Sequence, residues 1–180
     1  MTRLIGLLRG VNVGGKSKLS MSALRELVEG LGYTHVQTHL QSGNVVFTSN
    51  DHTETAARKI EAALQCDLGL SSAVVLRTRD ELVDVIERSL LADVASAPEH
   101  YVVFFLSEAP DPKRLASIDP SAFAPDVFRP SGREIYAWFP EGMGRSRLLS
   151  ALSDKRLGVV ATARNWKTVT ALLRIADSHS

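Results

Sequence analysis

The chain has 180 residues, of which 44% are hydrophobic and 23% charged, and its formal net charge is +1. These values are typical of a globular protein with a sizeable core, built as one domain or as two small subdomains. No apolar run approaches the roughly 20 residues that span a bilayer, and the single Cys66 excludes an intrachain disulfide and a multi-cysteine metal site. With no signal-peptide pattern at the N-terminus, we expect a cytoplasmic protein without a membrane partner.

The small net charge hides an uneven distribution along the chain. Residues 1–50 hold five Lys/Arg and two acidic residues, a net +3; residues 51–144 hold nine and sixteen, a net −7; residues 145–180 hold seven and two, a net +5. If the two ends of the chain meet, they form a basic patch on an acidic body. The alternative is that the charges only cover solvated helix faces.

The first half of the chain predicts a βαββαβ order with a helix added. A β-compatible strand, residues 3–8, precedes a Gly-rich loop at 9–18, and Ser20 or Ser22 caps a helix with apolar residues at helical spacing. Two strands then flank Gln41–Asn44, which has the chemistry of a hairpin turn. The remaining predicted elements are strands 34–40, 45–49 and 73–78, a helix from 51–53, and a helix over 80–91.

A similar order recurs in the second half, after a linker predicted at 92–100. The predicted elements are strand 101–106, helix 112–118, strands 126–129 and 134–139, helix 145–152, strand 158–162 and helix 165–176. We therefore predict an α+β protein with a ferredoxin-like unit over 1–91 and a second, smaller α+β unit of similar order over 92–180, in tandem. Two Ser-Gly turns, 42–43 and 131–132, lie in matching places.

This topology brings polar loops to common sheet edges. The first and second strands of a βαββαβ unit run in the same direction, so loop 9–18 and turn 41–44 are expected to be neighbours. Segments 140–146 and 162–166 of the second unit are expected to share an edge by the same reasoning. Because the first strand is aliphatic on both faces, we expect its sheet to be covered twice, which disfavours an open RNA-binding platform.

Residues 10–17 match the phosphate-loop pattern G-x-x-x-x-G-K-[ST] and follow a predicted strand. In such a loop, backbone N–H groups and the Lys hold phosphates, and a helix begins at the Lys-Ser pair. Here Lys18 to Ser20 predict more loop before the helix, and the hairpin at 41–44 breaks the alternating order that this fold requires. The pattern therefore favours anion binding without nucleotide hydrolysis, or a turn whose glycines serve only positive φ angles.

Two further motifs offer polar groups. Gln41 to Asn44 supply amides and a hydroxyl, although a tight hairpin also favours Gly and Asn. Residues 162–168 predict the start of the last helix, where Arg164 and Lys167 would attract an anion and Trp166 would stack on a base or pack in the core. The candidate ligand-binding residues are Arg9, Asn12, Gly14, Gly15, Lys16, Gln41, Ser42, Asn44, Arg164, Asn165, Trp166 and Lys167.

Other chemistries find little support in the sequence. His35 and His39 are expected on one strand face, too far apart to chelate one metal together. No nucleophile elbow, HExxH motif or close carboxylate pair is present. We therefore assign no catalytic residue, no metal ligand and no cofactor.

Three segments carry a family resemblance: residues 7–16, 41–47 and 162–169. Together they resemble the bacterial family known as domain of unknown function 1697, with the motifs in the family's order. The resemblance implies a small α/β protein whose biochemical role is unassigned.

The sequence leaves three hypotheses for function. The first is binding of a phosphate-bearing ligand, either a nucleotide or a nucleic-acid backbone. The second is an enzyme acting on a phosphorylated small molecule positioned by Lys16, Arg164 and Asn165, for which no general base is visible. The third is that the motifs serve only turns, caps and packing. A homodimer is compatible with each of them.

Overall fold

The computed structural model describes residues 1–15 and 17–178, and these form two compact units. The first unit comprises Met1–Asp84 and the C-terminal residues from Ala171; the second comprises Val85–Thr170. Both boundaries fall inside helices, α3 (Arg79–Arg88) and α7 (Trp166–Asp177). The boundary predicted from the sequence, between residues 91 and 92, lies beyond the end of α3.

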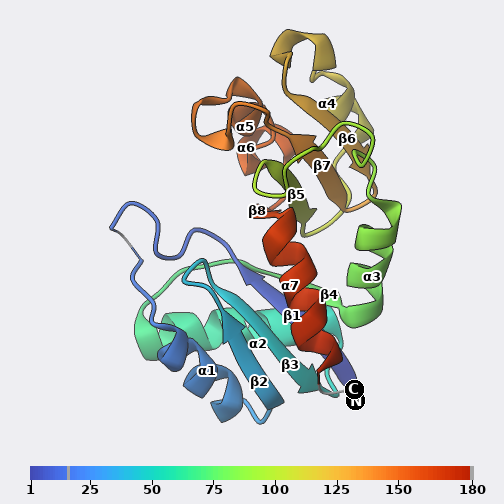
Figure 1. The fold of residues 1–180 in the computed structure, drawn as a ribbon. Coiled ribbons are helices and arrows are strands. Elements are labelled where there is room, and N and C mark those ends of the chain that lie inside the picture. Colours follow the sequence, from blue (N-terminus) through green and yellow to red (C-terminus); the bar gives the residue numbers. More distant parts are fainter. Residues whose placement is uncertain (16, 179–180) are drawn as a thin grey trace. The chain divides into compact units, whose positions relative to one another are not determined.

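The first unit is built around a four-stranded antiparallel sheet of order β2-β3-β1-β4 (Figure 1). Strand β1 pairs with both β3 and β4, so it occupies a central position, with Ile5 opposite Val46 and Arg77. The elements of this unit before α3 are β1 (Thr2–Leu8), α1 (Met21–Gly30), β2 (Thr34–His39), β3 (Asn44–Ser49), α2 (Thr53–Leu68) and β4 (Val74–Thr78).

Both faces of this sheet are buried. On one face, every second strand residue packs with the apolar sides of α1 and α2 in a common core that includes Leu8, Phe47 and Ile60. On the other face, Ile5 and Val46 are also fully buried. The expectation of a sheet covered twice is therefore confirmed, and the stacking of Phe47 on Tyr33 inside the core removes its ring from any nucleic-acid platform.

Two local signals set the helix boundaries in the first unit. Ser20, one of the two candidate caps predicted from the sequence, caps α1 by accepting a hydrogen bond from the backbone N–H of Ala23. Thr78 and Glu81 form a reciprocal capping box at the start of α3, with distances of 3.1 and 2.8 Å. The first turn of α3 is also fixed within the unit by an ion pair between Arg79 and Asp177.

Strand β2 departs from the expected alternation. The register of β2 with β3 shifts between Thr34 and Gln37, and His35 has a φ of +50°. The prediction that His35 and His39 lie on one strand face is therefore wrong, because the irregularity interrupts the two-residue period. Among residues 1–15 and 17–178, no three His, Cys, Asp or Glu side chains gather as a metal site would need.

The second unit has its own four-stranded antiparallel sheet, of order β6-β7-β5-β8. Its pairing register matches that of the first sheet: Val103 in β5 lies opposite Tyr136 and Arg164, as Ile5 lies opposite its two partners. The strands and helices are β5 (Tyr101–Leu106), α4 (Pro112–Ala116), η1 (Pro120–Phe123), β6 (Val127–Ser131), β7 (Glu134–Trp138), η2 (Met143–Arg145), α5 (Arg147–Ala151), α6 (Asp154–Leu157) and β8 (Ala161–Asn165).

The α+β class predicted from the sequence is confirmed by these two sheets and their helices. Several element boundaries differ from the prediction. Helix α3, predicted over 80–91, ends at Arg88. The helix predicted over 145–152 is divided, because Ser146 leaves the helical conformation to cap α5. Strand β8, predicted over 158–162, is shifted to Ala161–Asn165, and α7 runs from Trp166 to Asp177. Asn165, one of the two residues predicted to cap the last helix, is the last residue of β8 and does cap α7 through its side chain.

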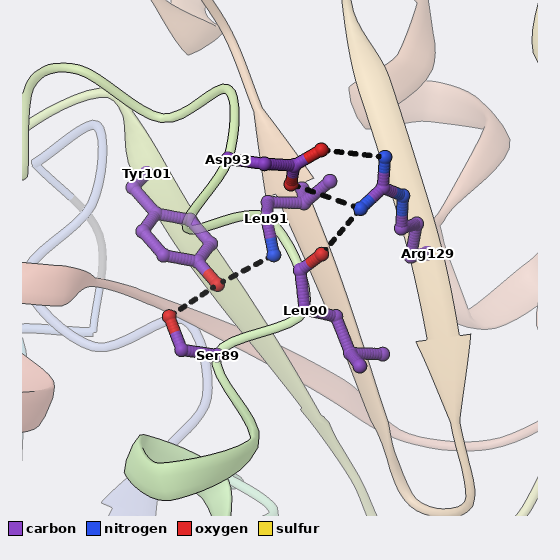
Figure 2. Close-up of polar contacts among 6 residues, drawn as sticks. All are labelled: Ser89, Leu90, Leu91, Asp93, Tyr101 and Arg129. Atoms are coloured by element: carbon purple, nitrogen blue, oxygen red, sulfur yellow. Dashed lines mark hydrogen bonds and ion pairs between the residues drawn. The ribbon is translucent and has the colours of Figure 1, made fainter.

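The connection from α3 to β5, predicted as a linker, is held by specific hydrogen bonds (Figure 2). The hydroxyl of Tyr101 accepts from the backbone N–H of Leu91 at 3.2 Å. The guanidinium of Arg129, on β6, pairs with both carboxylate oxygens of Asp93 and donates to the backbone oxygen of Leu90. The connection is thus fastened to two strands of the second sheet.

In the described part of the chain, no helix is both long and apolar enough to span a membrane.

Candidate functional site

Three segments meet at one edge of the first sheet, and we call them together the loop cluster: residues 9–19, 40–43 and 71–73. Strand β1 ends where 9–19 begins, and the β2–β3 hairpin turns at 40–43. Residues 71–73 precede β4, which runs antiparallel to β1. The backbone N–H of Arg9 donates to the oxygen of Ala73, and the N–H of Leu8, the last residue of β1, donates to the oxygen of Gly43, both at 2.9 Å. Asn12 joins the loop to the turn through the backbone oxygen of Gln41. The predicted proximity of loop and turn is confirmed.

Asn12 fastens the loop from within. Its side-chain N–H groups donate to the backbone oxygens of Leu19, at 2.8 Å, and of Gln41, at 2.7 Å, while its side-chain oxygen accepts from the N–H of Leu19 at 2.9 Å. The backbone N–H of Asn12 also donates to the oxygen of Ser17. This one carboxamide therefore closes the loop and ties it to the hairpin turn.

The phosphate-loop pattern does not have the structure of a nucleotide-hydrolase site. Helix α1 begins at Met21, capped by Ser20, rather than directly at Ser17. The first helical N–H groups are therefore not presented by the Lys-Ser pair, as that mechanism requires. Lys16 itself lies outside the described residues.

Left-handed backbone conformations are concentrated in the loop cluster. For non-glycine residues this conformation costs on the order of 1 kcal/mol each, so it persists where surrounding contacts impose it. Asn12, Ser17 and Leu40 adopt it with φ between +52° and +59°. The cluster glycines with positive φ are Gly10, Gly14, Gly15 and Gly43.

Gly43 is required by space as well as by φ. A Cβ atom at this position would lie 2.5 Å from Cγ2 of Val11 and 2.9 Å from Cβ of Leu8. Both contacted side chains are buried. The turn can therefore approach the loop only because residue 43 has no side chain.

Asn44 and Ser42 form a small hydrogen-bond network under the turn. The buried side chain of Asn44 donates to the backbone oxygen of His39, at 2.6 Å, and to the hydroxyl of Ser42, at 3.0 Å. Gln41 contributes its backbone oxygen to Asn12 and is itself exposed. Asn44, one of the turn residues predicted to bind a ligand, thus uses its side chain for hydrogen bonds within the turn.

The outer surface of the loop is basic and exposed. Arg9, Gly14, Gly15 and Lys18 are all exposed to solvent, and the sequence from residue 9 to residue 20 contains three basic residues and no acidic one. Val13 also points outward, with 66% of its surface exposed. The loop therefore combines a fixed base with an exposed backbone at Gly14 and Gly15 and with exposed positive charges at Arg9 and Lys18.

The C-terminal motif belongs to the second unit, where its side chains have internal contacts. Arg164 is 7% exposed and donates to the hydroxyl of Thr162 and the backbone oxygen of Ala163, both at 2.8 Å. Burial lowers the pKa of Arg164 to about 10, which leaves it protonated at neutral pH. Arg77 holds the equivalent register position in the first sheet and is also buried.

The other three motif residues also contribute to the second unit. The side-chain oxygen of Asn165 accepts from the N–H of Thr168 at 3.0 Å and so caps α7. Trp166 stacks on Tyr101, with ring centroids 4.5 Å apart and an interplanar angle of 10°. Lys167 is exposed and forms an ion pair of 3.1 Å with Glu99.

The sequence reasoning missed two hollows. One, of about 450 Å³, lies in the first unit between α2 and residues 71–73, and includes Glu61 and Gln65. The other, of about 410 Å³, lies in the second unit and includes Asp126, Arg145 and Ser146. The sequence signal that could have indicated the first hollow is that residues 58, 61 and 65 are polar and recur at helical spacing, on the exposed side of the predicted helix.

Comparison with known proteins gives the family. The model of the family described as "Protein of unknown function (DUF1697)" matches residues 1–136. The chain belongs to the DUF1697 family. The match includes the whole loop cluster of this DUF1697 protein and ends before Arg164.

The fold of this DUF1697 chain is also found in a solved structure. The conserved bacterial protein SP0830 from Streptococcus pneumoniae is similar with a TM-score of 0.75 and 22% sequence identity, over 97% of this chain and 98% of that chain. At this identity the similarity concerns the fold. No curated protein sequence matches the chain.

Proposed function

We propose that the loop cluster binds a phosphate-bearing ligand, either a nucleotide or a nucleic-acid backbone. The observation that carries the proposal is that one loop residue holds the loop in place through internal hydrogen bonds while other loop residues stay exposed to solvent. Asn12 is used internally to fix the loop, whereas Arg9, Gly14, Gly15 and Lys18 remain exposed. A loop held in this way presents its backbone and charges without a large ordering cost on binding.

The chemistry of the loop favours an anion. Backbone N–H groups near left-handed residues form concave sites for oxyanions, and glycines allow a phosphate to approach the main chain closely. The local sequence adds positive charge without a neighbouring carboxylate between residues 9 and 20. Phosphate groups satisfy both features, because they carry several acceptor oxygens and a negative charge.

The test measures salt dependence and charge removal together. We expect a fluorescently labelled 12-nucleotide single-stranded DNA and ADP to bind at 50 mM salt, and the affinity for the DNA to fall steeply at 200 mM salt as counterion release weakens. Arg9→Ala and Lys18→Ala should each weaken binding several-fold. Arg25→Ala removes the same charge from the exposed face of α1 and should leave binding unchanged.

Three results would contradict this proposal. They are the absence of binding to either probe at low salt, a DNA affinity that does not depend on salt, and an equal loss of affinity in the Arg25→Ala control. The third result would show that only the net charge of the protein matters.

An architectural role of the motifs is the second candidate, and the contacts of Asn44 and Asn165 favour it for these two residues. Asn44→Ala and Asn165→Ala should lower the melting temperature and leave the affinity for either probe unchanged. A variant that folds as stably as the parent but binds less tightly would contradict this role and return the residue to the ligand site.

We further infer that each unit has the ferredoxin-like plan and that the two form a tandem pair. The support is the same strand order in both sheets and the same register around their central strands, β1 and β5. A bacterial origin is proposed from the similarity to a bacterial protein. Cytoplasmic location, a homodimer and catalysis on a phosphorylated substrate stay predictions of the sequence.

A further inference from the structure

A polar hollow is lined in part by residues 71–73 of the loop cluster. It has a volume of about 450 Å³, within the range of small-molecule sites, and it lies between the exposed side of α2 and the segment before β4. The lining side chains that can form hydrogen bonds are those of Arg58, Glu61, Gln65, Ser71 and Ser72.

Two hydrogen bonds connect the lining of the hollow to the backbone of Arg9, the first residue of the loop in the proposed phosphate site. The hydroxyl of Ser72 donates to the backbone oxygen of Arg9, and the backbone N–H of Arg9 donates to the oxygen of Ala73, both at 2.9 Å. Ser72 and Ala73 therefore form the wall of the hollow and also contact the first residue of the loop. A ligand held at the start of the loop would be adjacent to this wall.

The groups in the hollow suit hydroxyl groups better than an aromatic base. Glu61 uses Oε1 to accept from the N–H of Val74, at 2.8 Å, which fixes its carboxylate against the strand. Gln65 and Ser71 are exposed and offer both donors and acceptors. Each sugar hydroxyl both donates and accepts, so this mixture of a carboxylate, a carboxamide and hydroxyls is complementary to a polyol.

We propose that the ligand is a phosphorylated sugar, such as the ribose phosphate part of a nucleotide, with its phosphate on the loop and its hydroxyls in this hollow. This inference rests on the proposed phosphate site. The hollow would bind the sugar of the ligand, which the loop cannot recognise, and Glu61 and Gln65 would be the specificity-determining residues.

The experiment compares three probes by isothermal titration calorimetry: inorganic phosphate, ribose 5-phosphate and ribose. We expect ribose 5-phosphate to bind about tenfold more tightly than inorganic phosphate, the gain from one additional hydrogen bond to a charged group. Ribose alone should bind too weakly to measure. Gln65→Ala should reduce the preference for ribose 5-phosphate at least threefold without changing the affinity for inorganic phosphate.

Two further variants separate this inference from the proposed function. Arg9→Ala should weaken both phosphate compounds by the same factor, whereas Cys66→Ala, an exposed neighbour on α2 outside the hollow, should change neither. Binding of inorganic phosphate that depends on Arg9, with no preference for the sugar phosphate, would overturn this inference alone. An absence of binding by both phosphate compounds, or binding insensitive to Arg9→Ala, would overturn both.

If Gln65→Ala were to reduce stability, Glu61→Gln provides a second measurement. The carboxamide oxygen can still accept from Val74, so the fold is preserved, while the loss of charge should weaken ribose 5-phosphate and leave inorganic phosphate unaffected or slightly tighter. An unchanged preference in both variants would contradict a sugar site at this position.

Discussion

Replacing Gly43 with alanine should destabilise the protein through two separable effects. The first is conformational, because φ is +82° at this residue and a left-handed conformation costs a non-glycine residue about 1–2 kcal/mol. The second is steric, because the new Cβ would lie 2.5 Å from Cγ2 of Val11 and 2.9 Å from Cβ of Leu8. Overpacking of a buried contact costs about 1–3 kcal/mol. The expected total loss is about 2–5 kcal/mol.

Gly32 provides a control in the same unit. Its φ is +85°, close to that of Gly43, but a Cβ at this position would meet nothing within 4 Å. Gly32→Ala should therefore show only the conformational loss of about 1–2 kcal/mol. The difference between the two variants isolates the steric part, which we expect to be about 1–3 kcal/mol.

The assay is urea unfolding followed by circular dichroism, with the free energy of unfolding taken from the midpoint and slope. A double mutant completes the test: Val11→Ala removes the methyl group nearest the new Cβ, so Gly43→Ala should cost less in that background than in the parent. Equal losses for Gly43→Ala and Gly32→Ala, or strict additivity of Val11→Ala and Gly43→Ala, would refute the argument that the turn and the loop are in direct contact.

Three other substitutions test individual contacts. Asn12→Ala removes three hydrogen bonds of the loop and should reduce the free energy of unfolding by about 1–3 kcal/mol, with faster amide exchange at Leu19 measured by NMR. Hydrogen bonds, first from Lys59, hold the pKa of Asp51 below its usual value, so its contribution to the free energy of unfolding is present above about pH 4 and is lost as the pH falls further. Asp51→Asn should therefore make the free energy of unfolding less dependent on pH in the acid range. Tyr101→Phe leaves the N–H of Leu91 without its acceptor and should cost about 1–2 kcal/mol, measured by urea unfolding.

Each of these predictions has a control. Asn50→Ala changes an exposed Asn in the first unit and should leave amide exchange in the loop unaltered; slower or unchanged exchange in Asn12→Ala would contradict the fastening role. Lys59→Ala should reproduce part of the Asp51→Asn effect, and a parent-like acid limb in both variants would exclude the ion pair as its origin. For Tyr101→Phe, retained stability and unchanged protection of the Leu91 amide would exclude the proposed bond.

The candidate residues show where sequence reasoning succeeded and where it did not. Topology alone predicted that loop and turn would be neighbours, because the direction of each strand follows from the element order. The pattern did not predict that Asn12 would be turned inward while Arg9 stays exposed, since both are polar residues in a Gly-rich loop. Arg164, a basic residue that the motif suggested for anion binding, is buried and donates to the hydroxyl of Thr162, and the local motif gave no sign of this burial.

The amino-acid sequence by itself determined the α+β class, the position of most strands and helices, a serine cap at residue 20 or 22 and the family. These depend on local periodicity and on side chains within a few residues of one another. Tertiary structure decided the closeness of Gly43 to Val11, the hydrogen bonds of Asn12 and Asn44, and the hollow beside Ser72. Each of these joins residues that are distant in sequence, and side-chain direction and burial in such contacts are fixed only when the strands pair in register and the core packs.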